Sequence, residues 1–497
     1  MTLLTTEEYK AIAASLTFPT QAFIDGAFRP AISGKTFDTV NPATGQVLAH
    51  VAACGPEDVD FTVQKARDAF EDGRWSRLHP RERKEVLIRL AKLIKRNARE
   101  LAVMESLDSG KTIYDCETVD VPETIHCLTW HAELIDKIYD QVAPASDNHI
   151  AMIVREPVGV VGLVLPWNFP LLMLAWKIGP ALAAGCSVIV KPAKETTLTA
   201  LRVAELAMEA GVPAGVFNVL PGGGAEVGEP IGRHMDIDAV SFTGSTVTGR
   251  KFLTYASESN LKEVTLEMGG KNPAVVLDDA ENLDRVAAHV VNGAFWNMGE
   301  NCSASSRLIV QKGVKDALLK RILAHAREWP MGDPLDPVNR VGALVSKAHF
   351  DKVSSFLGKG PKVLLGGKAE AGFVPPTILE VARDSVQARE EIFGPVLSVL
   401  TVDNFDEAIA LANSTEYGLA ASIFTANTKK AIRGARAIRA GTVTVNSFGE
   451  GDISTPFGGF KQSGFGGRDN GIHAHDQYTQ IKTIWVDLAD DADEAVA

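Results

Sequence analysis

The chain has few cysteines, no long apolar run and no concentration of positive charge. Its 497 residues include five cysteines, and none of these forms a Cys-x-x-Cys pair or a Cys/His cluster, which disfavours a disulfide framework and a metal site. The net charge of −12 disfavours nucleic-acid binding. The most apolar stretch, residues 158–165, is too short to span a bilayer, and the first residues do not resemble a signal peptide. We therefore expect a cytoplasmic protein that binds neither membranes nor nucleic acid.

Apolar strands alternate with helices in the middle of the chain. The predicted strands are residues 158–165, 187–191, 216–220 and 239–243, and the predicted helices between them are residues 174–184, 197–210 and 227–233. Apolar strands joined by helices are typical of a parallel sheet that is covered on both faces. The fold class is therefore α/β, with a Rossmann-type nucleotide-binding sheet. A second α/β segment begins near residue 266 and includes predicted strands at residues 274–277, 307–310 and 396–402.

Two polar motifs follow predicted strands in the first segment. The sequence Pro-Trp-Asn-Phe-Pro at residues 166–170 places Asn168 at the carboxyl end of a strand, where its amide can donate a hydrogen bond to an oxyanion. An Asn that caps the next helix is an equally good interpretation. The sequence at residues 242–249, which includes Gly244 and Ser245, precedes a predicted helix over residues 249–256. Such a loop can bind a phosphate at the helix N-terminus, or it can be a simple turn.

Two further motifs carry a carboxylate and a thiol. Glu267 lies at a strand end before two glycines, a position that suits a general base but also an ordinary turn. Cys302 follows Gly-Glu-Asn, and its polar neighbours indicate an accessible thiol, since a structural cysteine usually lies among aliphatic residues. Taken alone, each motif is weak.

Taken in order, these motifs resemble the aldehyde dehydrogenase family. The likeness runs from about residue 21 to residue 486, and it includes Lys-Pro-Ala at residues 191–193, Glu-Glu-Ile-Phe-Gly-Pro at 390–395 and Pro-Phe-Gly-Gly-Phe-Lys-Gln-Ser-Gly at 456–464. The ordered set is specific where single motifs are not. The resemblance implies an NAD-dependent, hydrolytic enzyme that oxidises an aldehyde to its carboxylic acid.

The resemblance also implies a role for each catalytic residue. Cys302 attacks the aldehyde, Asn168 stabilises the oxyanion, and Glu267 activates the water that hydrolyses the thioester. Lys177 and Asp469 resemble a pair that passes protons onward, although the loop before Asp469 is one residue longer than usual.

The implied cofactor site draws on several segments. Its residues are Trp167, Lys191, Lys194, Gly244, Ser245, Glu391 and Phe393. The family often has Glu where this chain has Lys194, and a lysine there tolerates a 2′-phosphate. We therefore expect NAD as the cofactor, with NADP also possible.

The implied substrate site is rich in large side chains. Its residues are Phe169, Met173, Trp176, Trp296, Asn301, Ser303 and Phe457, with Trp130 as a looser candidate. Aromatic walls favour a bulky aromatic aldehyde such as indole-3-acetaldehyde. Glu450 and Asp452 favour instead an aminoaldehyde of polyamine catabolism, such as 4-aminobutyraldehyde or its γ-glutamyl derivative, because carboxylates attract an ammonium group. The two substrate classes are nearly balanced, with the aromatic one slightly ahead.

Two other functions compete with hydrolytic aldehyde oxidation. A CoA-acylating relative commonly lacks a base at the position of Glu267, and a non-enzymatic protein on this fold would tolerate loss of Cys302. Both residues are present here, which disfavours these alternatives.

The expected architecture has three parts. A nucleotide-binding domain comprises residues 1–137 and 158–265, and a catalytic domain comprises residues 266–465. Residues 138–157 and 478–488 form an oligomerisation arm, since an exposed strand edge invites pairing with another subunit. In the family such arms give homodimers or homotetramers.

Overall fold

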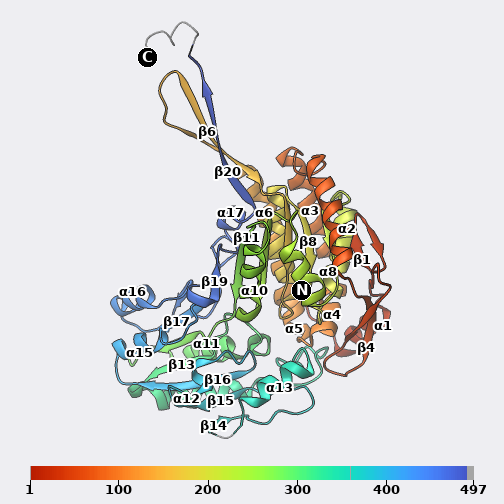
Figure 1. Cartoon of the computed structure of the whole chain (residues 1–497). Coiled ribbons are helices and arrows are strands. Elements are labelled where there is room, and N and C mark those ends of the chain that lie inside the picture. Colours follow the sequence, from red (N-terminus) through yellow and green to blue (C-terminus); the bar gives the residue numbers. More distant parts are fainter. Residues whose placement is uncertain (1, 359, 490–497) are drawn as a thin grey trace.

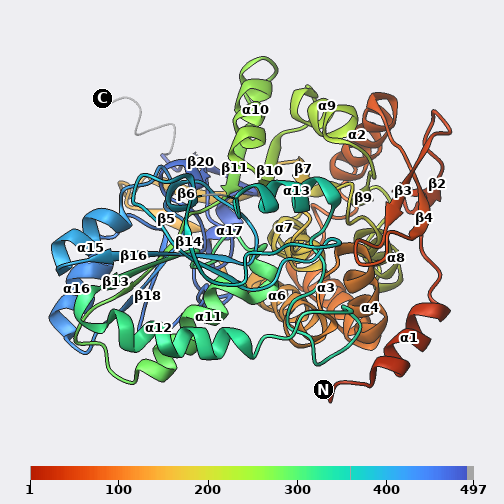
Figure 2. The ribbon, with the colours of Figure 1, turned by 90° about the horizontal axis from the view of Figure 1, so that it is seen from below.

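The computed structural model describes residues 2–358 and 360–489. Two large sheets, each covered by helices, form two parts of the molecule, and a narrow arm projects from one end (Figure 1). Seen from below, the helices of the two sheets gather at opposite sides (Figure 2). Within the described ranges, no helix has the length and apolar character needed to cross a membrane. The two helix-covered sheets confirm the predicted α/β fold class.

The first sheet has a parallel centre and antiparallel edges. Across the sheet, its eight strands are β19 (Gly464–Phe465), β11 (Glu263–Met268), β10 (Ala239–Gly244), β7 (Val160–Val164), β8 (Ser187–Lys191), β9 (Phe217–Val219), β1 (Ala22–Ile24) and β2 (Ala27–Arg29). The strands from β11 to β9 are parallel, while β19, β1 and β2 pair antiparallel. The expectation of a parallel sheet therefore describes only the centre.

Helices cover both faces of this sheet because its central strands are apolar on both sides. Val161 and Leu163 of β7 lie in one core, while Val160 and Val164 lie in the other. The first core is formed with α3 (Pro80–Arg96), α4 (Ala98–Ser109), α6 (Val121–Leu134), α7 (Pro170–Ala184) and α8 (Leu198–Ala210). The second is formed with α2 (Pro56–Glu71), α9 (Glu229–Arg233) and α10 (Thr246–Ser257). Successive strand residues point to opposite faces, which explains the continuous apolar runs.

One helix begins earlier than the sequence pattern predicts. The predicted helix over residues 174–184 starts at Pro170 in the structure. Proline is well suited to the first position of a helix, because its missing N–H has no partner there in any case. The second proline of the Pro-Trp-Asn-Phe-Pro motif therefore starts α7 directly and leaves Asn168 in the short loop before it.

The second sheet has seven strands. Across the sheet these are β14 (Lys362–Leu365), β15 (Thr377–Glu380), β16 (Val396–Val402), β13 (Arg307–Gln311), β12 (Pro273–Val276), β17 (Ala420–Phe424) and β18 (Thr442–Val445). One face packs on α11 (Leu283–Phe295) and α12 (Lys312–Arg327), and the other on α15 (Phe405–Ala412). The short helix α13 (Lys347–Ser355) follows α12 and reaches toward the first sheet (Figure 2). Residues 269–272 connect β11 to β12, so the two sheets divide a few residues after the predicted boundary at residue 265.

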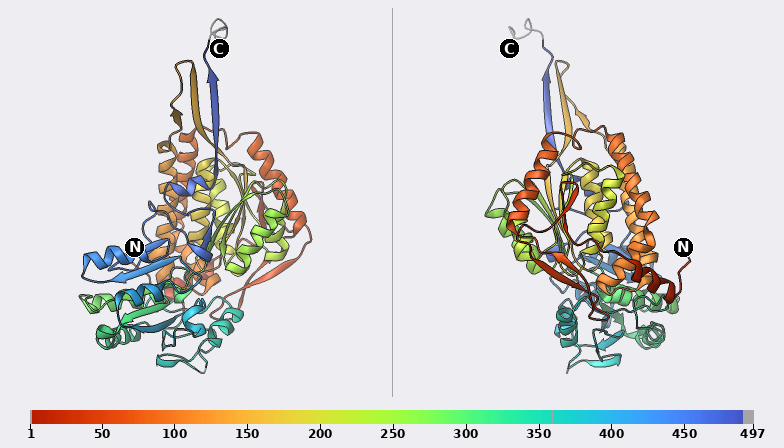
Figure 3. Two further views of the ribbon diagram at one scale, coloured as in Figure 1. Left: turned by 60° about the vertical axis from the view of Figure 1, so that its left-hand side comes forward. Right: turned by 90° about the vertical axis from the view of Figure 1, so that its right-hand side faces the viewer.

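The arm is a three-stranded antiparallel sheet. β20 (Thr479–Asp487) pairs along its whole length with β6 (His149–Pro157), and β5 (Gln141–Ala143) pairs on the other side of β6. Both side views show the arm extending well beyond the body (Figure 3). One edge of β20 has no partner strand among the described residues.

Candidate active site

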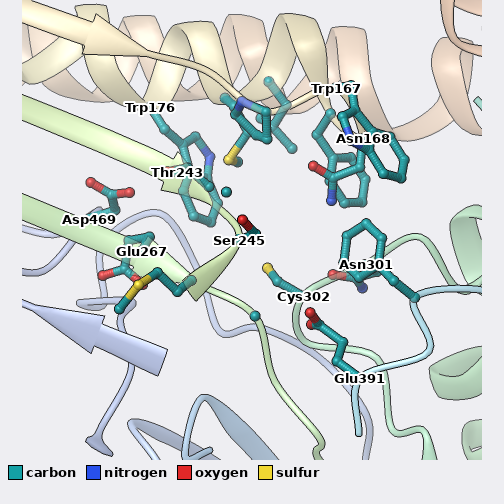
Figure 4. Close-up of a pocket in the computed structure, with 18 of the residues that line it drawn as sticks. Trp167, Asn168, Trp176, Thr243, Ser245, Glu267, Asn301, Cys302, Glu391 and Asp469 are labelled. Carbon is teal, nitrogen blue, oxygen red and sulfur yellow. The ribbon is translucent and has the colours of Figure 1, made fainter. Parts of the chain in front are cut away.

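A cavity of about 220 Å³ lies where the strand ends of the two sheets meet. The first sheet contributes the loops after β7, β10 and β11, and the second contributes the loops before β13 and β16. The carboxyl ends of parallel strands are the usual ligand crevice of such sheets. Fourteen of the sequence-predicted site residues line this inner cavity: Trp167, Asn168, Phe169, Met173, Trp176, Gly244, Ser245, Glu267, Asn301, Cys302, Glu391, Phe393, Phe457 and Asp469. Figure 4 shows side chains that line the cavity, among them those of Asn168, Glu267 and Cys302.

Cys302 lies on a tight loop between α11 and β13. The loop begins with the 3₁₀ turn η4 (Trp296–Gly299), in which Asn297, Met298 and Gly299 all adopt left-handed φ angles between 53° and 65°. A Cβ atom at Gly299 would lie 2.2 Å from the carbonyl oxygen of Gly394, so this turn requires glycine. The turn presents the thiol of Cys302 to the cavity (Figure 4), whereas the other four cysteines are buried.

The thiol of Cys302 lies among carboxylates. Burial raises the pKa of this thiol well above its usual value, and Glu450, Glu391 and Glu267 raise it further, in that order. Each negative charge disfavours a thiolate beside it. The free protein therefore holds the thiol mainly in its neutral form.

Asn168 is fixed by the loop that carries Cys302. Its Nδ2 donates to the carbonyl oxygen of Glu300 at 2.9 Å, and Nδ2 of Asn297 donates to the Asn168 carbonyl at 3.1 Å. An amide nitrogen carries two hydrogens, and the bond to Glu300 uses one of them. The Asn168 side chain lines the cavity, so the second hydrogen is available to an oxygen atom bound there.

Glu267 is the next-to-last residue of β11 and is buried. Burial raises the pKa of its carboxyl well above the usual value, and the nearby Asp469 raises it further. Asp469 also accepts a hydrogen bond from Nζ of Lys177 at 2.7 Å, and both partners of this ion pair are buried. The longer loop before Asp469 therefore does not keep it from Lys177 or from the cavity.

Five predicted site residues, and the looser candidate Trp130, lie outside the inner cavity. Lys177 is buried and forms its ion pair with Asp469, and Lys191 is buried at the end of β8. Lys194 is exposed, with its ammonium 5.3 Å from the centre of the Phe37 ring. Trp296 lines a neighbouring cavity, and Ser303 turns toward Glu450. Trp130 lines neither cavity and packs edge-on against His131.

The residues expected to hold NAD fit a dinucleotide. Ser245 caps α10, with its hydroxyl accepting from the Thr248 N–H at 3.3 Å, and a helix N-terminus favours a phosphate group. Glu391 accepts from the Gly270 N–H at 2.7 Å and lines the cavity, where a carboxylate can accept from ribose hydroxyls. Burial lowers the pKa of Lys191 to about 8, so its ammonium group would be stabilised by polar groups of a ligand.

Several residues of the inner cavity were not predicted from the sequence. They include Leu172, Thr243, Met268, His349 and Lys352. His349 donates from Nε2 to the Phe393 carbonyl at 2.7 Å, and its ring lies 4.8 Å from that of Trp167. It comes from α13, and neither its neighbours nor its spacing distinguishes it from other helical residues.

Aromatic rings form part of the cavity wall. Phe169 lies 5.3 Å from Trp296, and Trp176 lies 5.3 Å from Phe457, measured between ring centres. Beyond this wall lies an outer cavity of about 880 Å³, which shares Leu172, Trp176 and Glu450 with the inner one. These three residues lie at the junction of the two cavities.

Glu450 lies at this junction, whereas Asp452 does not. Glu450 accepts a hydrogen bond from the hydroxyl of Ser303, and burial raises the pKa of its carboxyl. Asp452 is exposed, lines only the outer cavity and accepts from the N–H and hydroxyl of Ser454. The two carboxylates that both favoured an aminoaldehyde therefore occupy different positions.

Known proteins resemble this chain over nearly its whole length. Residues 28–484 match the model of the aldehyde dehydrogenase family. The chain is 67% identical over 493 residues to the aminoacetaldehyde dehydrogenase of Pseudomonas aeruginosa. The match covers 98% of this chain and 99% of that protein. An indole-3-acetaldehyde dehydrogenase from P. syringae, solved with NAD+ and IAA, has a TM-score of 0.96 and 47% identity, with 98% of this chain and 100% of that chain covered.

A third relative is named for a different kind of aldehyde. The gamma-glutamyl-gamma-aminobutyraldehyde dehydrogenase from Burkholderia cenocepacia has a TM-score of 0.96 and 50% identity, with 98% of this chain and 100% of that chain covered. The match to the family model and these identities, together with the fold, confirm the predicted family and cofactor. The chain belongs to the aldehyde dehydrogenase family and is an enzyme that oxidises aldehydes with NAD.

Proposed function

We propose that Cys302 is the nucleophile of this oxidation and that Asn168 stabilises the oxyanion. The Sγ atom attacks the aldehyde carbon, and the oxygen of the resulting thiohemiacetal accepts from the free Asn168 amide hydrogen and from the Cys302 N–H. The position of both side chains in one cavity supports this assignment. Bound NAD+ supplies the hydride acceptor that turns the thiohemiacetal into a thioester.

Glu267 is the base for hydrolysis of the thioester. Burial raises the pKa of its carboxyl, and a higher pKa makes the carboxylate a stronger base toward water. Asp469, which forms an ion pair with Lys177, lies close to Glu267 (Figure 4), a position that suits onward transfer of the proton.

The proposed substrate is an aldehyde that carries a positive charge, such as an aminoaldehyde. The observation that carries this proposal is Glu450, whose carboxylate lines the same cavity as Cys302. A partly buried carboxylate is stabilised by an ammonium group, and the faces of Trp176 and Phe457 suit both a cation and its methylene chain. The name of the 67% identical relative, aminoacetaldehyde dehydrogenase, supports the same class.

An aromatic aldehyde is the second candidate. The paired rings of Phe169 with Trp296 and of Trp176 with Phe457 would bind a flat apolar group. The relative that is named for indole-3-acetaldehyde has a similar fold. We place this candidate second because it leaves the partly buried Glu450 carboxylate without a cation.

Replacing Glu450 with glutamine is expected to remove the preference for a charged substrate. We expect kcat/KM for 4-aminobutyraldehyde to fall about 30-fold, since a desolvated ion pair contributes roughly 2 kcal/mol. Pentanal has the same chain length without the charge, and its kcat/KM should stay the same or rise. The measurement is NADH formation with 4-aminobutyraldehyde, pentanal, phenylacetaldehyde and indole-3-acetaldehyde.

Asp452→Asn is the matched control for this variant. It removes a negative charge from the same loop, but at a position outside the inner cavity. The ratio of kcat/KM for 4-aminobutyraldehyde to kcat/KM for pentanal should therefore change less than about threefold, as for a solvent-exposed ion pair. A wild-type preference for phenylacetaldehyde or indole-3-acetaldehyde over 4-aminobutyraldehyde would reverse the order of the two candidates.

We also propose that the arm pairs with a second copy of this chain. β20 presents an edge, and the side chains of Ile481 and Trp485 on it are 68% and 60% exposed. Apolar side chains on an exposed edge strand favour association. The variant Ile481→Lys/Trp485→Lys is expected to run as a monomer in size-exclusion chromatography with light scattering. An unchanged mass would place the contact between subunits elsewhere.

The use of NADP stays a prediction. Lys194 is exposed and close to Phe37, which leaves its ammonium able to move toward a 2′-phosphate.

A further inference from the structure

Glu450 touches the residue that follows the nucleophile. Its carboxylate accepts a hydrogen bond from the hydroxyl of Ser303, and the backbone N–H of Ser303 donates to Oδ1 of Asn301 at 3.0 Å. Asn301, Cys302 and Glu450 line the inner cavity together. The carboxylate is therefore held beside the loop that carries the thiol, and it does not extend freely into solvent.

Few positive charges offset the carboxylates around this thiol. The described residues that line the inner cavity include one lysine, Lys352, and no arginine. The charged groups that face Cys302 are Glu450, Glu391 and Glu267, in decreasing order of their effect on its pKa. The charged groups near Glu450 that do not line this cavity are Asp120 and Lys111, which form an ion pair with each other. The ionised Glu450 therefore acts on the thiol with little local compensation.

We propose that Glu450 keeps Cys302 unreactive in the free enzyme and that the positive charge of the substrate releases it. An ammonium group that enters from the outer cavity pairs with Glu450 and cancels its field at Sγ. The thiol then ionises, with its proton passing to water, and the thiolate attacks the aldehyde end of the same molecule. This inference rests on the proposed aminoaldehyde substrate. It adds control of the Cys302 thiol to the proposed role of Glu450 in binding the ammonium group.

The arrangement gives selectivity at the step of thiol activation as well as at binding. A neutral aldehyde of the same length reaches the cavity but leaves the Glu450 charge in place, so the thiolate fraction stays low. Because burial raises the pKa of Glu450, its negative charge develops only as the pH rises. The restraint on the thiol is therefore weak in acid and grows toward alkaline pH.

The alkylation rate of Cys302 by iodoacetamide tests this proposal. Iodoacetamide is neutral, and its carbon–sulfur bond forms from the thiolate with loss of iodide, so the rate follows the thiolate fraction. We expect Glu450→Gln to react about fivefold faster than the wild type near pH 8, as for removal of a nearby like charge. The gain should shrink as the pH is lowered. Asp452→Asn is the control and should react at the wild-type rate.

A second arm uses the charge of a ligand without its aldehyde. Saturating n-butylammonium and n-butanol obstruct the cavity to a similar extent, so the ratio of the two alkylation rates reports the charge alone. We expect several-fold faster alkylation with n-butylammonium in the wild type and a ratio near one in Glu450→Gln. Cys302→Ser, analysed by mass spectrometry of the labelled peptides, identifies any reaction at the four buried cysteines.

The outcomes separate this inference from the proposed substrate class. If the wild type prefers 4-aminobutyraldehyde over pentanal, but Glu450→Gln and n-butylammonium leave the alkylation rate unchanged, Glu450 only binds the ammonium and the activating role is wrong. If the wild type shows no such preference, the substrate class itself is wrong. A loss of alkylation in Glu450→Gln would also contradict the inference, provided that NAD+ binding and thermal unfolding match the wild type.

Discussion

Cys302→Ala is expected to lower the rate of aldehyde oxidation by at least about 10⁴-fold and to leave NAD+ binding intact. Without the sulfur atom no covalent intermediate forms, and the remaining groups only bind the aldehyde. The Cys302 side chain makes no hydrogen bond to the residues expected to hold the cofactor, so the site for NAD+ should be preserved. Steady-state NADH formation measures the first effect, and the dissociation constant of NAD+ from quenching of protein fluorescence measures the second.

Cys302→Ser is the matched variant for this test. It preserves the shape of the loop but replaces the thiol by a hydroxyl group, which ionises far less readily, so a loss nearly as large is expected. Turnover of either variant within tenfold of the wild type would assign the nucleophile to another residue. Loss of NAD+ binding in both variants would instead point to a misfolded loop.

Glu267→Gln is expected to stop the reaction after the first half. The thioester on Cys302 should form at a near-normal rate, giving a burst of one NADH per active site. Steady-state turnover should then fall about 10²- to 10³-fold, because general-base catalysis contributes an effect of this size. Rapid mixing with an aldehyde and NAD+ separates the burst from the slow phase.

The pH dependence of the wild type provides a second check on Glu267. Because the pKa of this carboxyl lies well above its usual value, the base is protonated and inactive at acid pH and becomes active as the pH rises. Hydrolysis of the thioester should therefore accelerate toward alkaline pH in the wild type and lose this dependence in Glu267→Gln. Full steady-state turnover of the variant would show that another group activates the water.

Local patterns in the sequence predicted much of the fold. The apolar run at residues 187–191 has the same bounds as β8, since a short apolar segment between turn residues has few alternatives to a buried strand. The predicted start of α7 was wrong by four residues, because the predicted helix over residues 174–184 left out the turn that Pro170 begins. The antiparallel edges were also missed. Their strands are two or three residues long, and such segments lack a periodic pattern.

The motifs of the sequence also predicted most of the candidate site. Asn168, Glu267 and Cys302 each belong to a short segment with glycine or proline nearby, and the structure brings all three to one cavity. Ser303 and Glu450 were both noted, but nothing near either residue indicates that they bond to each other. They lie 147 residues apart, and their contact depends on how the loop after β18 returns to the first sheet.

The sequence by itself determined the apolar strands, the helices and the identity of the reactive groups, because these depend on neighbours within a few residues and on side-chain chemistry. Only the tertiary structure decided which groups share a cavity, as for Lys177 and Asp469, which are 292 residues apart. It also decided that Glu450 and Asp452, two residues apart, lie in different surroundings. The reason is that packing of the two sheets removes water from some carboxylates and leaves others exposed, and the loss of water governs the charge and reactivity of the thiol between them.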